Sequence, residues 1–349
     1  MYHVYITCLK KPLQFFCYML SCCYIVYLYY YKIKLMGDYT MEVKKYKMKR
    51  EKNLYRIIAL RDFGNVKKGD IGGLVQNKSN LSHNSNCWVE YGATVRDNAM
   101  VLDNAVVKGY SFVVGDSQVF GDAVIEGHAI IRGSARVRGK AIVGGNAVIE
   151  DNAIVRGNAR VFENAKLRDN ACVSGHAKIH GNAVISDKAY VYSNAEVEGK
   201  AVVRGCSIVE CAAKVFDDAI VEGNSNVYGY ANVYGHAHVT DNAILRDEAI
   251  VRGKAKVRDN SIAEGNVILE GKAIIDGDAR VLHGTHTNKV QYIKGSDYTA
   301  TIDGNYININ NRSHTPVEWP TIIDKWVIDS DKKEEYKGIV LFLKNTYMS

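Results

Sequence analysis

Residues 141–158 read AIVGGN AVIEDN AIVRGN, three six-residue units in succession, and this spacing runs from residue 93 to residue 281 without insertion or deletion. Every sixth residue from Ala93 to Ala279 gives 32 positions, of which 26 are Ala, five are Ser and one is Val267. Two residues further on, 31 of 32 positions hold Val, Ile or Leu, with Ala263 as the exception. Two residues beyond these, 28 of 31 positions hold Gly or Asp, and Asn often follows.

Each unit predicts one short strand and one corner. The small and aliphatic residues lie two apart, so they point to the same side of a strand. Gly, Asn and Asp tolerate positive φ, and Asp and Asn are expected to hydrogen-bond their own backbone at the corner. A strand this short cannot bury its own face, so the copies must stack as a solenoid. A nine-residue calcium-binding repeat and a coiled-coil heptad both have the wrong period.

This pattern resembles the hexapeptide repeat of left-handed parallel β-helices, in which three units form one triangular coil of eighteen residues. The resemblance implies a left hand, which the period itself does not reveal. We expect about ten coils and a length of ~50 Å at the usual ~4.8 Å strand spacing. The fold class is therefore all-β, a single-stranded left-handed parallel β-helix.

Two departures from the repeat occur together. Ala263 is smaller than its position usually requires, Val267 is larger, and they lie on adjacent units. Packed interiors tolerate exchanges that conserve total volume. We therefore expect these two residues to compensate for each other.

The N-terminal segment differs from the rest in charge. Residues 1–62 carry 12 Lys/Arg and 4 Asp/Glu, whereas the remainder carries 33 and 34. The repeat is thus neutral, which argues against a nucleic-acid footprint. The cysteines have no metal-ligand spacing, so we expect no metal site and a reduced, cytoplasmic protein.

Residues 13–31 are uncharged and long enough to span a membrane, although six of the nineteen are Tyr, which prefers the interface. Either residues 1–40 form a leader or membrane anchor, or the true start is Met36 or Met41 instead of Met1. The second interpretation agrees with the cytoplasmic localisation, and the first would make the protein membrane-anchored.

Caps are expected on both sides of the β-helix, because an open end exposes an unpaired strand edge. Residues 41–92 form the N-terminal cap, residues 93–282 the β-helix, and residues 283–349 a C-terminal cap or small accessory domain. In the latter, Gly304 and Asn305 predict a hairpin turn. A final helix is expected from about Lys332, with Asp331 as N-cap and one face formed by Tyr336, Val340, Leu343 and Tyr347.

The N-terminal cap carries the more specific resemblance. Its residues are similar to the opening of a group of bacterial and prophage β-helix proteins, often labelled hexapeptide-repeat proteins or transferases. The matching positions are Tyr55, Arg56, Ile57, Ala59, Leu60, Asp62, Phe63, Val66, Gly69, Gly72, Gly73, Cys87 and Trp88. The resemblance covers roughly residues 41–300 and implies the fold and a phage-derived origin more than a biochemical activity.

An enzymatic alternative also comes from resemblance, because many left-handed β-helix proteins are trimeric acyltransferases that use acetyl-CoA and a His between subunits. His236, His238 and Asp241 form the densest polar cluster of the sequence and are the candidate catalytic residues. His128, His176 and His236 occupy corner positions, where a polar residue needs no function. The repeat lacks the extruded loop that such transferases usually carry, and spacing assigns no carboxylate partner to any His.

One outward column is largely apolar. Reading every eighteenth residue from Thr94 places Phe112, Ile130, Val148, Val184, Val202 and Ile220 on one face. A continuous apolar stripe of this length is more than a monomer normally exposes. Either the C-terminal segment folds over it or another subunit does, so we expect a homo-oligomer, for example a trimer.

The sequence thus favours a non-catalytic structural or binding β-helix without a cofactor. An acetyl-CoA-dependent acyltransferase of the hexapeptide class is the alternative. Fold alone does not decide between them.

Overall fold

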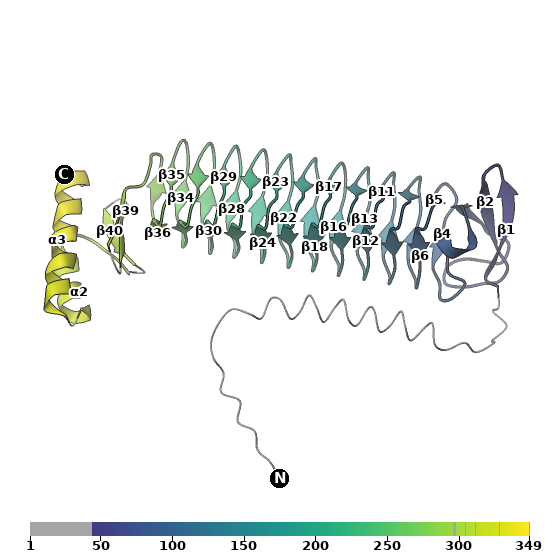
Figure 1. Ribbon diagram of the computed structural model, residues 1–349, viewed down its shortest axis with the longest axis horizontal. Coiled ribbons are helices and arrows are strands. Elements are labelled where there is room, and N and C mark those ends of the chain that lie inside the picture. Colours follow the sequence, from purple (N-terminus) through teal and green to yellow (C-terminus); the bar gives the residue numbers. More distant parts are fainter. Residues whose placement is uncertain (1–43, 296–297, 304, 311, 328, 349) are drawn as a thin grey trace, which may run out of the picture. The chain divides into compact units, whose positions relative to one another are not determined.

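The computed structural model describes residues 44–348 except 296–297, 304, 311 and 328. It confirms a parallel β-helix built from two-residue strands that recur every six residues, from β5 (Thr94–Val95) to β36 (Arg280–Val281). Figure 1 shows the coils stacked one on the next. The left hand remains an expectation from the resemblance.

Three parallel ladders form the faces of the prism, because each strand pairs with the strand eighteen residues away. Face I runs from β5 to β35 (Ile274–Ile275), face II from β6 (Met100–Val101) to β36, and face III from β4 (Trp88–Val89) to β37 (Thr285–His286). Face III contains twelve strands, more than the ten coils expected, since β4 and β37 extend the ladder beyond the recognisable repeat. At β37 the register shortens by one residue, with Ile268 opposite Thr285.

The interior is formed by the small and aliphatic positions of the unit. Both kinds of residue are fully buried from Ala93 to Val281, including Ala263 and Val267. Ser replaces Ala without leaving its hydroxyl unsatisfied, because the hydroxyl donates to the carbonyl three residues earlier, as Ser207 does to Arg204 at 2.7 Å. The core is therefore a stack of nearly identical layers, and each coil stabilises its neighbours.

The corner residues connect one coil to the next. Gly and Asp in the fifth position have positive φ, for example Asp187 at 58° and Gly205 at 75°. We expected the Asp carboxylate to hydrogen-bond its own backbone, but this expectation is wrong. The carboxylate accepts the N–H of the same corner eighteen residues later. The Asn side chains behave alike, with Asn224 Nδ2 donating to Asn242 Oδ1 at 3.1 Å.

The N-terminal cap is a three-stranded antiparallel unit. Strands β1 (Tyr46–Glu51), β2 (Leu54–Ala59) and β3 (Ile71–Val75) pair in order, and β3 then pairs in parallel with β5. A short 3-10 helix, η1 (Lys78–Asn80), follows. Strand β3 thus joins the antiparallel unit to the first strand of face I.

The C-terminal segment forms a second, smaller core. Its four antiparallel strands are β38 (Tyr292–Lys294), β39 (Thr299–Asp303), β40 (Tyr306–Ile309) and β41 (Arg312–His314). Asp303 is opposite Tyr306, which confirms the hairpin expected at residues 304–305. Helix α2 (Trp319–Trp326), which the sequence did not indicate, packs against helix α3 (Ser330–Tyr347).

Two details of the expected final helix are wrong. Helix α3 begins at Ser330, because Asp329 and not Asp331 is the N-cap and accepts the N–H groups of Asp331 and Lys332. Tyr336, Val340 and Leu343 are buried as expected, but Tyr347 near the helix end is 49% exposed.

The proposed membrane-anchor segment 13–31 and the alternative starts Met36 and Met41 lie outside the described residues. Within residues 44–348, none of the helices that the structure describes is both long and apolar enough to cross a bilayer.

Candidate functional site

The apolar column predicted on face I lies side by side in register. Ile130 pairs with Phe112 and with Val148, and Val202 pairs with Val184 and with Ile220. Lys166 interrupts the column between Val148 and Val184. The aliphatic members are half-buried by their neighbours in the ladder, whereas Phe112 is 44% exposed.

Two exposed tyrosines lie close to Phe112. Tyr110 precedes it at the corner that leads from face III to face I, and Tyr91 occupies the corner one coil earlier; they are 65% and 69% exposed. The Tyr110 ring stacks on His128 with centroids 5.4 Å apart, and the Arg56 guanidinium lies 4.8 Å from the Tyr91 ring. The N-terminal end of face I is therefore aromatic and exposed.

The C-terminal segment stacks on the last coil. Strand β39 packs against β36 of face II, and Thr301 Oγ1 donates to the carbonyl of Arg280 at 2.5 Å. Lys289 forms a parallel bridge with Ile274, the last member of the face I column. Among the described residues, the C-terminal segment therefore packs against the end of the β-helix and does not cover the face I column from Phe112 to Ile220.

The candidate catalytic residues His236, His238 and Asp241 each have a different partner. His238 Nε2 lies 2.6 Å from Glu222 Oε1, and His236 Nδ1 lies 3.8 Å from Asp218. The carboxylate of Asp241 accepts the backbone N–H of Asp259 at 3.2 Å, which is the corner role described above. The three residues therefore do not form one cluster.

The His238–Glu222 pair belongs to a longer charge ladder on face I. Glu222 also binds Arg204, with a nitrogen–oxygen distance of 2.5 Å. Burial raises the pKa of Glu222, but the hydrogen bonds from His238 and Arg204 outweigh it and keep that pKa below its ordinary value. A similar arrangement occurs on face III, where His180 Nε2 lies 3.2 Å from Glu196 and 3.4 Å from Glu198.

The diagonal partners Glu222 and Glu196 gave no signal in the sequence because only residues eighteen apart, and only on face I, were compared. His238 and Glu222, like His180 and Glu196, are sixteen apart, since diagonal neighbours on adjacent strands differ by two from the coil period. Reading the sequence at this spacing would have found them.

Face II carries a polar and aromatic cluster that the sequence analysis also missed. Arg156 and Ser174 both donate to the hydroxyl of Tyr190, the latter at 3.3 Å. The Tyr190 and Tyr192 rings are 4.9 Å apart at 50°. Burial, with the hydrogen bond and charge of Glu210, raises the pKa of Tyr192 well above its ordinary value.

Cys172 lies within the same cluster. Burial raises its pKa, although the nearby arginines and Tyr190 lower it in part. A thiol whose pKa is raised is a poor nucleophile at neutral pH. Cys172 is therefore poorly suited to act as a nucleophile in this cluster.

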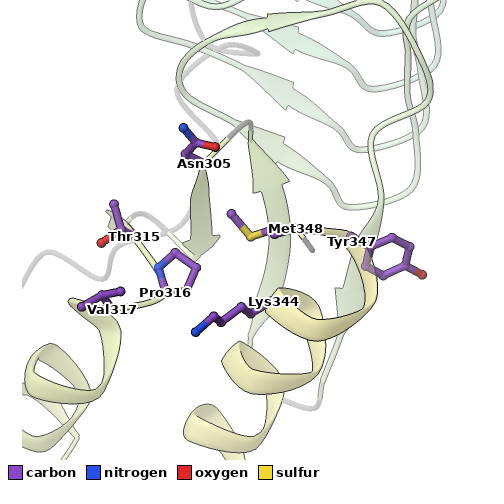
Figure 2. Close-up of a pocket in the computed structure, with 7 residues that line it drawn as sticks. All are labelled: Asn305, Thr315, Pro316, Val317, Lys344, Tyr347 and Met348. Atoms are coloured by element: carbon purple, nitrogen blue, oxygen red, sulfur yellow. The ribbon is translucent and has the colours of Figure 1, made fainter.

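A shallow hollow in the C-terminal segment offers no catalytic pair. Figure 2 shows it between the loop before α2, the start of β40 and the end of α3. Its lining comprises Asn305, Thr315, Pro316, Val317, Lys344, Tyr347 and Met348. Lys344 is the one charged side chain among these residues, so an acid–base pair cannot form from this lining.

Among the residues with described positions, no three His, Cys, Asp or Glu side chains are grouped to hold a metal ion. The chain matches no protein-family model, and none of the curated proteins compared with it matches either.

Proposed function

We propose that this protein is a non-catalytic structural or binding β-helix that self-associates through face I. The observation that carries the proposal is the in-register apolar column from Phe112 to Ile220, which ends in the exposed aromatic group of Tyr91, Tyr110 and Phe112. Exposed aromatic residues are typical of the well-packed centres of protein interfaces.

The second column of face I is compatible with a symmetric contact. Arg132 binds Glu150, and Arg204 binds Glu222 at 2.5 Å, so positive and negative charges alternate beside the apolar stripe. A two-fold contact requires a surface that is complementary to itself. Alternating charges beside an apolar column meet this requirement when two copies meet in antiparallel orientation.

Several polar groups of the repeat, including two of the candidate catalytic residues, are engaged in inter-coil bonds, which supports a structural role. Asp241 connects adjacent corners, and both His238 and His180 bind carboxylates on a neighbouring strand. These contacts stabilise the stack without requiring a substrate.

The test is the mass of the protein in solution. The double variant Val184→Glu, Val202→Glu places two charges side by side in the face I column, and light scattering should then report a smaller species. The matched control is Val124→Glu, Ile142→Glu, an equivalent in-register pair on face III. An unchanged mass for the face I variant, or an equal loss for both, would contradict self-association through face I.

The acyltransferase alternative has one observation in its favour. His238 has a carboxylate partner and lies in the face I column directly after Ile220, so a second copy on this face would lie against it. A His held by a carboxylate is suited to general-base chemistry. The second candidate function is therefore transfer from acetyl-CoA at a subunit boundary, with His238 as the base.

Thermal melting with and without acetyl-CoA separates the two functions. A ligand that binds only the native state raises the melting temperature. A rise in the native protein that is lost in His238→Gln but kept in His180→Gln would support the transferase. Equal melting temperatures with and without acetyl-CoA would support the non-catalytic function.

A further inference from the structure

A row of arginine and aromatic side chains crosses the first half of face II. Phe120, Arg138, Arg156, Ser174 and Tyr192 occupy the same position in five successive coils, and Tyr190 lies beside the last of them. We call these six residues the face II track. The first five directly follow the strands β9 (Gln118–Val119), β12 (Arg136–Val137), β15 (Ile154–Val155), β18 (Cys172–Val173) and β21 (Tyr190–Val191), which pair in order.

Arg138 differs from the arginines of the repeat that meet a carboxylate one coil later. Arg204 lies 2.5 Å from Glu222, Arg252 lies 2.5 Å from Glu270, and Arg258 lies 3.0 Å from Asp276. On the track, Arg138 is followed one coil later by Arg156, because Arg136 pairs with Ile154. Like charges side by side on a sheet are destabilising.

Arg136 and Arg138 are not balanced by acids at salt-bridge distance: among the described residues, no carboxylate oxygen lies within 4.0 Å of their charged nitrogens. Arg138 instead lies over the Phe120 ring, 6.0 Å from its centroid. A bound anion would offset this repulsion and accept the planar guanidinium donors.

The arginines are also held in place. Arg156 donates to the Tyr190 hydroxyl, its guanidinium is 6.0 Å from the Tyr190 ring, and Ser174, only 8% exposed, donates to the same hydroxyl. A side chain fixed by such bonds loses less entropy when it binds a ligand. The centre of the track is therefore preorganised.

Aromatic rings lie at both ends of the track. Phe120 and Tyr192 are four coils apart, or ~19 Å at the usual ~4.8 Å strand spacing. The ~4.8 Å between adjacent coils is close to the length of one pyranose unit in an extended glycan, so consecutive sugars would contact consecutive coils. Aromatic faces pack against the C–H faces of sugar rings, and the guanidinium groups between them bind acidic substituents.

We propose that the face II track binds an extended acidic polysaccharide, with carboxylate or sulfate groups on Arg138 and Arg156 and sugar rings on Phe120 and Tyr192. The neutral charge of residues 63–349 does not favour nucleic acid, whose dense phosphates need a long basic surface. An acidic peptide accounts for the arginines but not for the aromatic ring at each end. The proposal concerns a different face from the one assigned to self-association and does not depend on it.

The test is calorimetric titration of the full chain with short oligogalacturonides, and with neutral galactan oligosaccharides, poly-dT and poly-Glu as comparisons. The acidic sugar should bind and the neutral sugar should not. Arg138→Gln should weaken binding about tenfold, since it removes one charge-assisted contact. Arg160→Gln, the same change in β16 (Arg160–Val161) of face III, should leave the affinity unchanged.

Tyr192→Ala should weaken the acidic sugar more than poly-Glu, with melting curves showing that each variant is folded. Absence of acidic-sugar binding, equal losses in Arg138→Gln and Arg160→Gln, or poly-dT or poly-Glu binding as tightly as the sugar would overturn the proposal. Light scattering of the same variants reports self-association separately, so failure of one proposal is distinguishable from failure of the other.

Discussion

The carboxylate of Asp187 accepts the backbone N–H of Gly205, which occupies the same corner one coil later, at 2.9 Å. Asp187 itself donates its N–H to Asp169, 3.2 Å away, so consecutive corners form a chain of hydrogen bonds along the β-helix axis. The φ of Asp187 is 58°, a conformation that Gly adopts freely and Asp tolerates. Gly at a corner therefore adopts positive φ without strain, whereas Asp tolerates this φ and gains an inter-coil hydrogen bond.

This relationship predicts an order of stability at the corner. Asp187→Ala should lower the free energy of unfolding by about 1 kcal/mol or more, because it loses a hydrogen bond to a charged group and keeps a strained positive φ. Asp187→Gly loses the same bond but relieves the strain, so it should cost less. Urea unfolding measures both variants; an Ala variant at least as stable as the Gly variant would contradict the argument.

Ala263 occupies a position that otherwise holds Val, Ile or Leu, and Val267 occupies a position that otherwise holds Ala or Ser, so their volumes should compensate for each other. Both side chains are fully buried, Ala263 in β33 (Ile262–Ala263) and Val267 next to β34 (Ile268–Leu269). Ala263→Val alone should destabilise the protein by about 1–3 kcal/mol through overpacking. Adding Val267→Ala should recover most of that loss. Thermal melting of the single and double variants decides it, and equal melting temperatures would remove the idea of compensation.

The fold could be predicted from the sequence because the same six-residue pattern recurs 32 times. Positions such as Ala141 and Val143 have one structural requirement each, which is to be buried. The small or aliphatic residue type at such a position indicates burial directly. The cap helix was placed less well, since both Asp329 and Asp331 are plausible N-caps and only the backbone shows that Asp329 accepts the N–H groups. A boundary of this kind depends on the local chain path, which the sequence does not specify.

The surface could be predicted only in part. The face I column emerged from an eighteen-residue reading, and the same reading on face II would have placed Arg138 beside Arg156. The His238–Glu222 pair needed the diagonal spacing. The burial of Lys45 with Cys87 had no signal at all, because the two are 42 residues apart and meet only through the cap.

The lowered pKa of Glu222 predicts how stability depends on pH. A carboxylate whose pKa is lower in the folded than in the unfolded state stabilises the protein above its ordinary pKa, near 4.5, and that stabilisation is lost as pH falls through the folded value. Glu222→Gln should therefore lose less stability than the native protein between neutral and acidic pH. Melting curves across this range test it; the exposed pair Lys67 and Asp62 gives the control Asp62→Asn, expected to change the profile less.

The N-terminal cap contains a fully buried lysine, Lys45. Lys45 Nζ donates to the Cys87 carbonyl at 2.8 Å, lies 3.3 Å from Cys87 Sγ, and is 5.0 Å from the centre of the Phe63 ring. Burial lowers the pKa of Lys45, and the contact with Cys87 limits that shift. Lys45→Ala should thus leave a cavity and an unsatisfied buried carbonyl, at a cost of about 2–4 kcal/mol.

Because each coil of a solenoid contacts only its neighbours, this loss should stay local. Hydrogen exchange should accelerate in β1 to β3 of Lys45→Ala and remain slow in the middle coils around Ile149. Lys47→Ala, an exposed residue in β1, is the matched control and should leave exchange unchanged. Uniformly faster exchange along the whole β-helix would mean that the cap and the coils unfold as one unit, and the nearest-neighbour argument would then be wrong for this protein.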